Sequence, residues 1–297
     1  MNTLIKKADI LIEALPYIRN FAGKTIVIKY GGKAMIDEKL KEGFAEDVVL
    51  LKYVGLNPII VHGGGPQINK MLETLGIEAK FIRGVRVTNE PTMEVVEMVL
   101  GGRINKEIVG LLNQHGGKAV GLTGKDGRLF TTKPFNPKSF MHRYGGSTGP
   151  LPEENYGLVG EVNHVNSELL LTLQNANFIP VIAPIGVDAN GKTHNINADL
   201  VAGSLAAAIQ AKKLLMLSDV KGIRDAGNHH VSTLSRKNME QMAKKKIIGD
   251  GMLPKVHACL TALQGGVEKA HIIDGRVPHA VLLEIFTDKG IGTEIVA

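Results

Sequence analysis

The chain contains 297 residues, of which 44% are hydrophobic, so it can bury a large core as one α/β domain or as two lobes. Its formal charge of +6 comes from lysines and arginines spread along the chain, and aromatic residues make up only 4%. Nucleic-acid sites combine basic patches with stacking platforms, so this composition argues against such a partner and favours attraction of small anions. The single cysteine, Cys259, cannot form an internal disulfide, which indicates a reducing, cytoplasmic environment.

The N-terminal segment predicts an amphipathic helix. Its apolar residues recur at spacings of three and four from Leu4 to Ile18. Pro16 lies inside this pattern and is expected to kink the helix or to begin a second one. Asp9 and Glu13 interrupt the apolar run, which excludes a signal peptide, and no apolar stretch approaches membrane-spanning length. Because this helix precedes the first strand, its apolar face must pack on the body of the protein or on another subunit.

Apolar strands then alternate with helices. The predicted strands are 25–30, 58–61, 118–122, 179–183, 213–217 and 270–273. The predicted helices are 37–54, 66–75, 91–113, 166–176, 199–211, 235–246 and 255–266. Apolar strands separated by helices predict an α/β fold with a mostly parallel central sheet sandwiched by helices. Ligands in such sheets bind beyond the carboxyl ends of the strands.

The chain is expected to be bilobal. The stretch 124–165 is rich in glycine, proline and charge and predicts hairpins or an excursion from the core. An apolar strand runs into the polar sequence DANGKTHNINAD near 180–195, which favours a lobe boundary there. We therefore expect an N-terminal helix at 1–20, an N-terminal lobe at 21–185 and a C-terminal lobe at 186–297.

Three predicted strands are followed by segments of similar composition, rich in glycine and polar residues. These segments are KYGG (29–32), HGGG (62–65) and SDVKG (218–222). Each segment alone could be an ordinary turn with a solvated lysine. Glycines expose backbone N–H groups, and a following helix adds its positive N-terminal end, so repetition at three strand ends predicts an anion site.

Two common nucleotide motifs are absent. The segment GLTGKDG (121–127) resembles a P-loop, but it lacks the first glycine of that motif and carries Asp126 where Ser or Thr is needed. No GxGxxG follows the first strand to indicate a dinucleotide. Any nucleotide is therefore held by a different architecture.

Three further segments admit plain structural interpretations. In NINAD (195–199), Asn197 or Asp199 could simply cap a helix. Lys255 in DGMLPKV could be merely exposed, and Arg86 in GVRVT could point outward from an ordinary strand. Taken in order with Lys29, HGGG and LLMLSDVKGI, however, these segments resemble the amino acid kinase family. Within it they resemble the members that phosphorylate N-acetyl-L-glutamate, and the resemblance covers residue 24 to the C-terminus.

The resemblance implies transfer of the γ-phosphoryl of ATP to the side-chain carboxylate of N-acetyl-L-glutamate, in arginine biosynthesis. It implies that Lys29 and Lys255 flank the transferring phosphoryl, with Asp199 between them. Backbone donors come from Gly32 and Gly64. The implied substrate-binding residues are Gly64, Gly65, Arg86 and Asn195, and the implied ATP-binding residues are Ser218, Asp219, Lys221, Gly222 and Lys255. Mg²⁺ would bridge phosphate oxygens with few protein ligands, so no metal cage is expected.

Both ends of the chain resemble members inhibited by L-arginine. The implied regulatory residues are Tyr17, His279, Glu284, Gly290 and Gly292. The N-terminal helix would join dimers into a hexameric ring. A plain terminal helix and a last hairpin are the alternative.

Two rival functions stay open. One is another acid kinase of the same fold, acting on aspartate, glutamate, carbamate or 2-aminoadipate. The other is a non-catalytic arginine sensor, which would need none of Lys29, Asp199 and Lys255.

Overall fold

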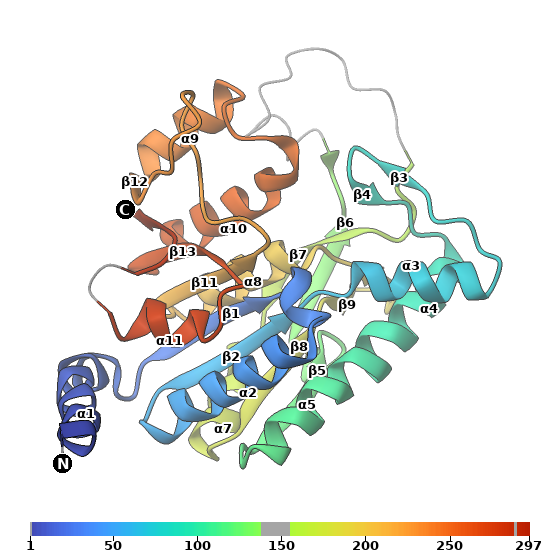
Figure 1. Cartoon of the computed structure of the whole chain (residues 1–297). Helices are drawn as coiled ribbons and strands as arrows, with labels where there is room; N and C mark the ends of the chain where they lie inside the picture. Colours follow the sequence, from blue (N-terminus) through green and yellow to red (C-terminus); the bar gives the residue numbers. More distant parts are fainter. Residues whose placement is uncertain (1, 138–154, 288–289) are drawn as a thin grey trace.

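An eight-stranded sheet forms the centre of the molecule in the computed structural model, which describes residues 2–137, 155–287 and 290–297 (Figure 1). Its strands are β1 (Thr25–Tyr30), β2 (Asn57–His62), β5 (Ala119–Thr123), β8 (Ile179–Ala183), β11 (Lys213–Ser218), β12 (Thr233–Ser235), β13 (Lys269–Asp274) and β14 (Thr293–Val296). The order is β12-β14-β13-β11-β1-β2-β8-β5, and neighbours are parallel except β13 and β14. The predicted mostly parallel α/β fold is confirmed.

Helices cover both faces of this sheet. The described helices of the whole chain are α1 (Asn2–Phe21), α2 (Glu38–Tyr53), α3 (Gly65–Thr74), α4 (Glu90–Glu97), α5 (Asn105–Gln114), α7 (Ser167–Asn175), α8 (Ala198–Ala208), α9 (Arg236–Lys244), α10 (Leu253–Gln264) and α11 (Ala280–Ile285). Side chains alternate along β1, so Ile26 and Ile28 join the core beneath α2, α5 and α11, whereas Val27 joins the core beneath α8 and α10. The sheet therefore lies between two separate cores, and Figure 1 shows the helices on its two faces.

A smaller sheet lies beside the main one. It contains β6 (Phe130–Pro134), β7 (Gly160–Val165), β9 (Ile185–Val187) and β10 (Thr193–Asn195), in the order β10-β9-β6-β7. The antiparallel pair β6 and β7 agrees with the excursion predicted over 124–165, of which 138–154 lie outside the described residues. The other short elements of the described chain are a hairpin of β3 (Phe81–Ile82) and β4 (Val85–Arg86) and the single turns η1 (Gly32–Met35), η3 (Asp126–Arg128) and η4 (Asp250–Met252).

The helix predicted over 91–113 is interrupted in its middle. A π-helical segment, η2 (Met98–Ile104), separates α4 from α5. Such segments are rare and occur frequently at functional sites. Leu100 and Ile104 of η2 pack so closely on Gly64 that a Cβ atom there would collide with both side chains. The π-helical segment η2 therefore packs against the HGGG loop and supports it.

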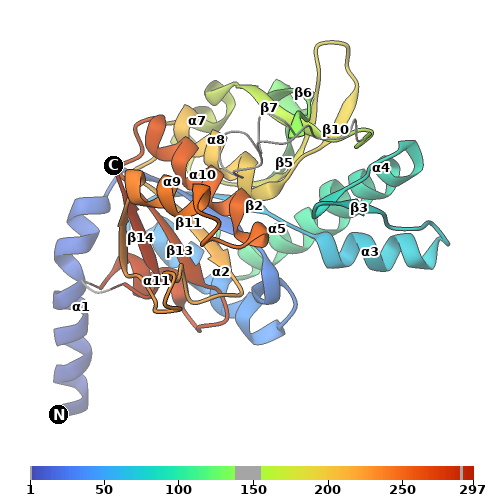
Figure 2. The same cartoon turned by 90° about the horizontal axis from the view of Figure 1, so that it is seen from above.

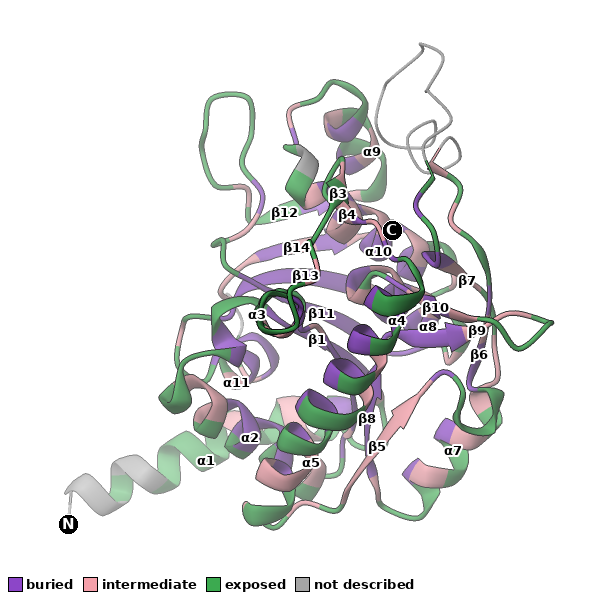
Figure 3. Cartoon of the chain, turned by 90° about the vertical axis from the view of Figure 1, so that its right-hand side faces the viewer, coloured by how far each residue is buried: buried purple, intermediate pink, exposed green. Residues whose placement is uncertain are grey.

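Helix α1 is continuous from Asn2 to Phe21, which excludes the alternative in which Pro16 begins a second helix. It projects beyond the rest of the chain, and its described part is mostly exposed (Figures 2 and 3). Its exposed apolar residues are Ile5, Ile10, Leu11, Ile12 and Leu15. None of the described helices is both long and apolar enough to cross a membrane. The main sheet draws strands from both predicted lobes, and the boundary at residue 185 stays a prediction.

Candidate active site and effector pocket

Three residues predicted as catalytic meet beyond the carboxyl end of β1. Lys29 lies near the end of this strand, and Asp199 and Lys255 lie in the first turns of α8 and α10. The Lys29 ammonium is 3.0 Å from Oδ1 of Asp199, and the Lys255 ammonium is 2.9 Å from its Oδ2. The carboxylate therefore bridges two cations at a place where two helix N-termini add positive potential.

Asp199 is an ion-pair partner rather than a helix cap. The cap of α8 is Asn197, whose side chain accepts a hydrogen bond from the Asp199 N–H at 2.8 Å. Burial alone would raise the pKa of Asp199, but Lys29 and Lys255 outweigh it and hold the pKa below its ordinary value. The side chain is ionised at neutral pH and keeps both lysines in place.

A cavity of about 360 Å³ opens beside these charges. Lys29, Gly32, Ser218, Asp219 and Lys255 line it. The segment DGMLPKV contributes further lining through Gly251 and Met252. Lys221 and Gly222, which were predicted with the ATP-binding residues, do not line it, because the next residue, Ile223, donates its N–H to Thr293 Oγ1 at 2.8 Å and draws the loop toward β14.

Gly32 brings the loop after β1 against the loop after β11. Asp219 Oδ1 accepts the N–H of Lys33 at 2.7 Å. Gly32 has φ +72, and a Cβ atom at this position would overlap the Asp219 carboxylate. Both the backbone conformation and the close approach therefore require glycine here.

Arg86 is a buried cation with unused donor capacity. Its Nη2 donates to Asn69 Oδ1 at 2.6 Å and to the Gly65 carbonyl at 3.3 Å, and its guanidinium lies over the Phe81 ring. Its Nη1 has no acceptor among the described residues, and none of their carboxylates pairs with it. Burial lowers the pKa of Arg86. An orphaned buried donor of this kind fits an anionic ligand.

Asn195 joins this group through Thr88, a residue that the sequence patterns did not single out. The Asn195 side chain donates to Thr88 Oγ1 at 3.2 Å, and Thr88 Oγ1 donates to the Arg86 carbonyl, also at 3.2 Å. Gly65, Arg86 and Asn195 are thus brought together by hydrogen bonds beside the HGGG loop. Thr88 is fully buried, which its place in the short GVRVT segment does not reveal.

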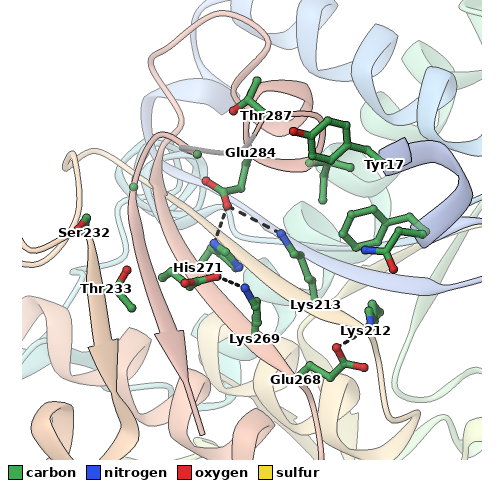
Figure 4. Close-up of a pocket in the computed structure, with 16 residues that line it drawn as sticks. Tyr17, Lys212, Lys213, Ser232, Thr233, Glu268, Lys269, His271, Glu284 and Thr287 are labelled. Atoms are coloured by element: carbon green, nitrogen blue, oxygen red, sulfur yellow. Dashed lines mark hydrogen bonds and ion pairs between the residues drawn. The ribbon is translucent and has the colours of Figure 1, made fainter. Parts of the chain in front are cut away.

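A second cavity, of about 380 Å³, lies between the end of α1 and the strands β11, β13 and β14 (Figure 4). We call it the effector pocket, after the arginine site that the sequence predicts there. Tyr17, Glu284, Gly290 and Gly292, four of the five predicted regulatory residues, line it. The fifth, His279, does not: its Nδ1 lies 2.6 Å from Asp47 Oδ1 on α2. His279 is the cap residue of α11, and its ring is held by Asp47 on α2 instead.

His271 lines the effector pocket instead, and the sequence patterns missed it. Its Nδ1 lies 2.5 Å from Glu284 Oε1, and the Lys213 ammonium is 4.0 Å from the same oxygen (Figure 4). Burial alone would raise the pKa of Glu284, but His271, Ile291 N–H and Lys213 outweigh it and lower the pKa. His271 Nε2 is buried without a partner among the described residues. A histidine inside the apolar strand AHII was the available signal.

Comparison with known proteins places these sites in a family. The sequence profile described as "Amino acid kinase family" matches residues 24–274. The chain is 57% identical over 293 residues to the acetylglutamate kinase of Syntrophobacter fumaroxidans, covering 99% of this chain and 97% of that protein. It is 56% identical over 298 residues to the acetylglutamate kinase of Aquifex aeolicus, covering 99% of each.

Solved structures share the fold. N-acetylglutamate synthase from Neisseria gonorrhoeae, complexed with coenzyme A and N-acetyl-glutamate, superposes with a TM-score of 0.83 at 24% identity, covering 98% of this chain and 63% of that chain. Carbamate kinase from Giardia superposes with a TM-score of 0.66 at 18% identity, covering 93% and 99% respectively. Since the family profile and the curated relatives span nearly all of its length, the chain belongs to the amino acid kinase family and, within it, to the acetylglutamate kinases.

Proposed function

We propose that this chain transfers the γ-phosphoryl group of ATP to the side-chain carboxylate of N-acetyl-L-glutamate, giving an acyl phosphate and ADP in arginine biosynthesis. The observation that carries the proposal is the Lys29–Asp199–Lys255 bridge beside an open cavity. A non-catalytic arginine sensor would have no use for it. The names of the relatives support the choice of acceptor over the other acid kinases of the same fold.

The reaction needs charge stabilisation rather than a base. The γ-carboxylate of the acceptor has a pKa near 4.3 as in glutamate, so it is ionised at neutral pH. One of its oxygens attacks the γ-phosphorus while the bond to the β-γ bridging oxygen breaks and ADP leaves. Lys29 and Lys255 would offset the negative charge on the moving phosphoryl group, and Asp199 would hold them apart at a set spacing.

Backbone donors and the metal complete the phosphoryl site. The N–H groups of Gly32 and Gly64 would donate to phosphoryl oxygens from two strand ends. The described residues contain no group of three or more His, Cys, Asp or Glu side chains arranged around a metal ion. Mg²⁺ would therefore arrive with ATP and be held mainly by phosphate oxygens, with Asp219 as the carboxylate that lines the cavity. Bound there, it would neutralise charge on the phosphates.

Arg86 would bind the acceptor's α-carboxylate. Its Nη1 lacks an acceptor, so a carboxylate can take that donor while Asn69 keeps Nη2 in place. Asn195 would bind the acetamido group or the second carboxylate oxygen. Gly64 and Gly65 would let the acceptor approach the backbone closely.

The effector pocket fits L-arginine as a feedback inhibitor. Carboxylates that line the pocket could bind the guanidinium and the α-amino group of arginine (Figure 4). Ammonium groups in the same lining could bind its α-carboxylate. Helix α1 contributes Tyr17 to this pocket and exposes an apolar row further along. The same helix would join dimers into a hexameric ring, so assembly and inhibition would share one element.

The proposal is tested by ADP release, measured by a coupled assay with N-acetylglutamate, glutamate, aspartate and 2-aminoadipate, each with and without arginine. We expect turnover with N-acetylglutamate at least about 100-fold above the free amino acids, because they lack the acetamido group that Asn195 would bind. Trapping of the product with hydroxylamine should give the hydroxamate of an acyl phosphate. Equal turnover with free glutamate would contradict the assigned acceptor.

A further inference from the structure

His62 ends strand β2 and directly precedes the three glycines of the HGGG loop. Its ring is fully buried. Nδ1 lies 2.8 Å from the carbonyl oxygen of Gly63, and Nε2 lies 3.2 Å from the side-chain amide nitrogen of Asn105. Nothing in the phosphoryl-transfer scheme above uses this side chain, although it touches the loop that supplies Gly64.

The hydrogen-bond partners leave one tautomer of His62. A carbonyl oxygen only accepts, so Nδ1 must carry the hydrogen. The Asn105 amide nitrogen donates to the Val181 carbonyl at 2.9 Å, and its second N–H is then directed at Nε2, which accepts. Asn105 Oδ1 accepts from the Lys106 ammonium at 3.0 Å, which sets the orientation of the amide. Burial lowers the pKa of His62 to about 4, so the ring is neutral in this network.

The bond to the Gly63 carbonyl sets the direction of the next N–H. In a trans peptide the C=O of one residue and the N–H of the next lie in one plane and point in opposite directions. The Gly63 N–H is already bound to the Tyr30 carbonyl at 2.8 Å, and the Gly64 carbonyl accepts from Ile68 N–H at 3.0 Å. Among the described residues the Gly64 N–H is left without an acceptor, as is the Gly65 N–H at the start of α3, but only the Gly64 N–H shares a peptide group with the Gly63 carbonyl. On its other side, Leu100 and Ile104 of η2 pack against Gly64.

We propose that His62 is a positioning residue: its neutral Nδ1–H tautomer holds the Gly63 carbonyl and thereby aims the Gly64 N–H at the transferring phosphoryl group. Asn105, at the junction of η2 and α5, holds the ring through Nε2. The target of the N–H rests on the proposed function, whereas the tautomer and the loop geometry do not. His62 takes no proton from either substrate in this scheme.

Two substitutions at His62 distinguish the roles of its two ring nitrogens. The amide nitrogen of His62→Asn can occupy the Nδ1 position and still donate to Gly63, whereas the longer His62→Gln reaches the Nε2 end and Asn105 instead. We expect H62N to keep kcat within about fivefold of the wild type and H62Q to lose about 100-fold, the effect of misplacing a catalytic group by about 1 Å. KM for both substrates should stay within about threefold in each variant. Equal losses in the two variants, or a loss confined to KM, would overturn the proposal.

A spectroscopic measurement decides the tautomer even if H62Q fails to fold. Long-range ¹H–¹⁵N correlation spectra of wild-type protein labelled with ¹⁵N-histidine should show one ring with a protonated Nδ1 and an unprotonated Nε2 from pH 6 to 8. The signal is assigned by its absence in H62N. A ring that is protonated at Nε2, or at both nitrogens, in this range would refute the proposal. A wild type that keeps the Nδ1–H tautomer but does not phosphorylate N-acetylglutamate would refute the proposed function instead.

Discussion

The ammonium group of Lys255 lies 2.9 Å from Oδ2 of Asp199, and this contact ties the start of α10 to the start of α8. Asp199 binds Lys29 through its other oxygen, so one carboxylate holds both cations. The distance between the two ammonium groups therefore depends on Asp199 as well as on the positions of β1 and α10. Removing either cation should therefore affect charge stabilisation more than substrate binding.

Lys255→Ala is expected to lower kcat about 100-fold or more, because it removes a fixed positive charge from the transition state. The KM values for ATP and N-acetylglutamate should change far less. Steady-state kinetics measure both, with the exposed Lys237→Ala on α9 as the matched control. A Lys255→Ala enzyme with near-normal turnover would remove Lys255 from the phosphoryl site.

Arg86→Lys is expected to raise the KM for N-acetylglutamate by about tenfold, because an ammonium lacks the planar guanidinium that holds Asn69 through one nitrogen and offers the other to the substrate. The KM for ATP should stay unchanged, since Arg86 does not line the cavity at Lys29 and Lys255. The exposed Arg103→Lys serves as the control. If only the ATP constant rises, Arg86 belongs to the nucleotide site.

The role of α1 is tested by two variants. Deleting residues 1–20 should reduce the oligomer and weaken arginine inhibition, because it removes both the exposed apolar row and Tyr17. Leu11→Glu alters only the exposed apolar row of α1, so it should lower the mass of the oligomer while Tyr17 stays in the effector pocket. Light scattering coupled to size exclusion measures the mass. An unchanged hexamer in both variants would rule out α1 as the contact between dimers.

His271 and His279 are expected to differ in arginine regulation. His271→Ala should raise the arginine concentration for half inhibition by about tenfold or more, because it removes a partner of the buried Glu284 carboxylate. His279→Ala should have a much smaller effect, since this side chain contacts Asp47 outside the effector pocket. Inhibition curves at fixed substrate concentrations compare the two. The reverse ranking would place the regulatory site nearer to His279.

Asp47 predicts a pH dependence of stability. Burial raises the pKa of its carboxyl from 3.8 to about 6, and the hydrogen bond from His279 opposes this only in part. Because the folded pKa lies above the unfolded one, this contribution to stability is complete below about pH 4 and is lost as the pH rises through about 6. His279 has a pKa raised by Asp47, so its contribution is also lost as the pH rises.

The measurement compares the wild type with Asp47→Asn in urea denaturation at pH 5 and pH 7.5. The free energy of unfolding of the wild type relative to D47N should fall by about 1 kcal/mol between these two values, because one pKa unit corresponds to about 1.4 kcal/mol. Oligomeric state must be the same at both pH values. A difference that grows with pH would mean that Asp47 is stabilised in its charged form.

The core strands and most helices were predictable because they depend on near neighbours. Apolar runs such as IVI and PIIV indicate buried parallel strands, and the glycines that follow them mark strand ends. The shared edge of a parallel sheet then brings these ends together without further information. By contrast, β12, β14 and α11 are too short for their periodicity to be recognised.

The amino-acid sequence by itself thus determined the fold class, the ligand edge of the sheet and the residue types gathered there. Only the tertiary structure decided which oxygen, nitrogen or ring faces which partner. It separated the cap Asn197 from the ion-paired Asp199, and it placed His271 rather than His279 at Glu284. The physical reason is range: caps and periodicity act over a few residues, whereas burial and charge pairing join side chains that lie far apart in the chain.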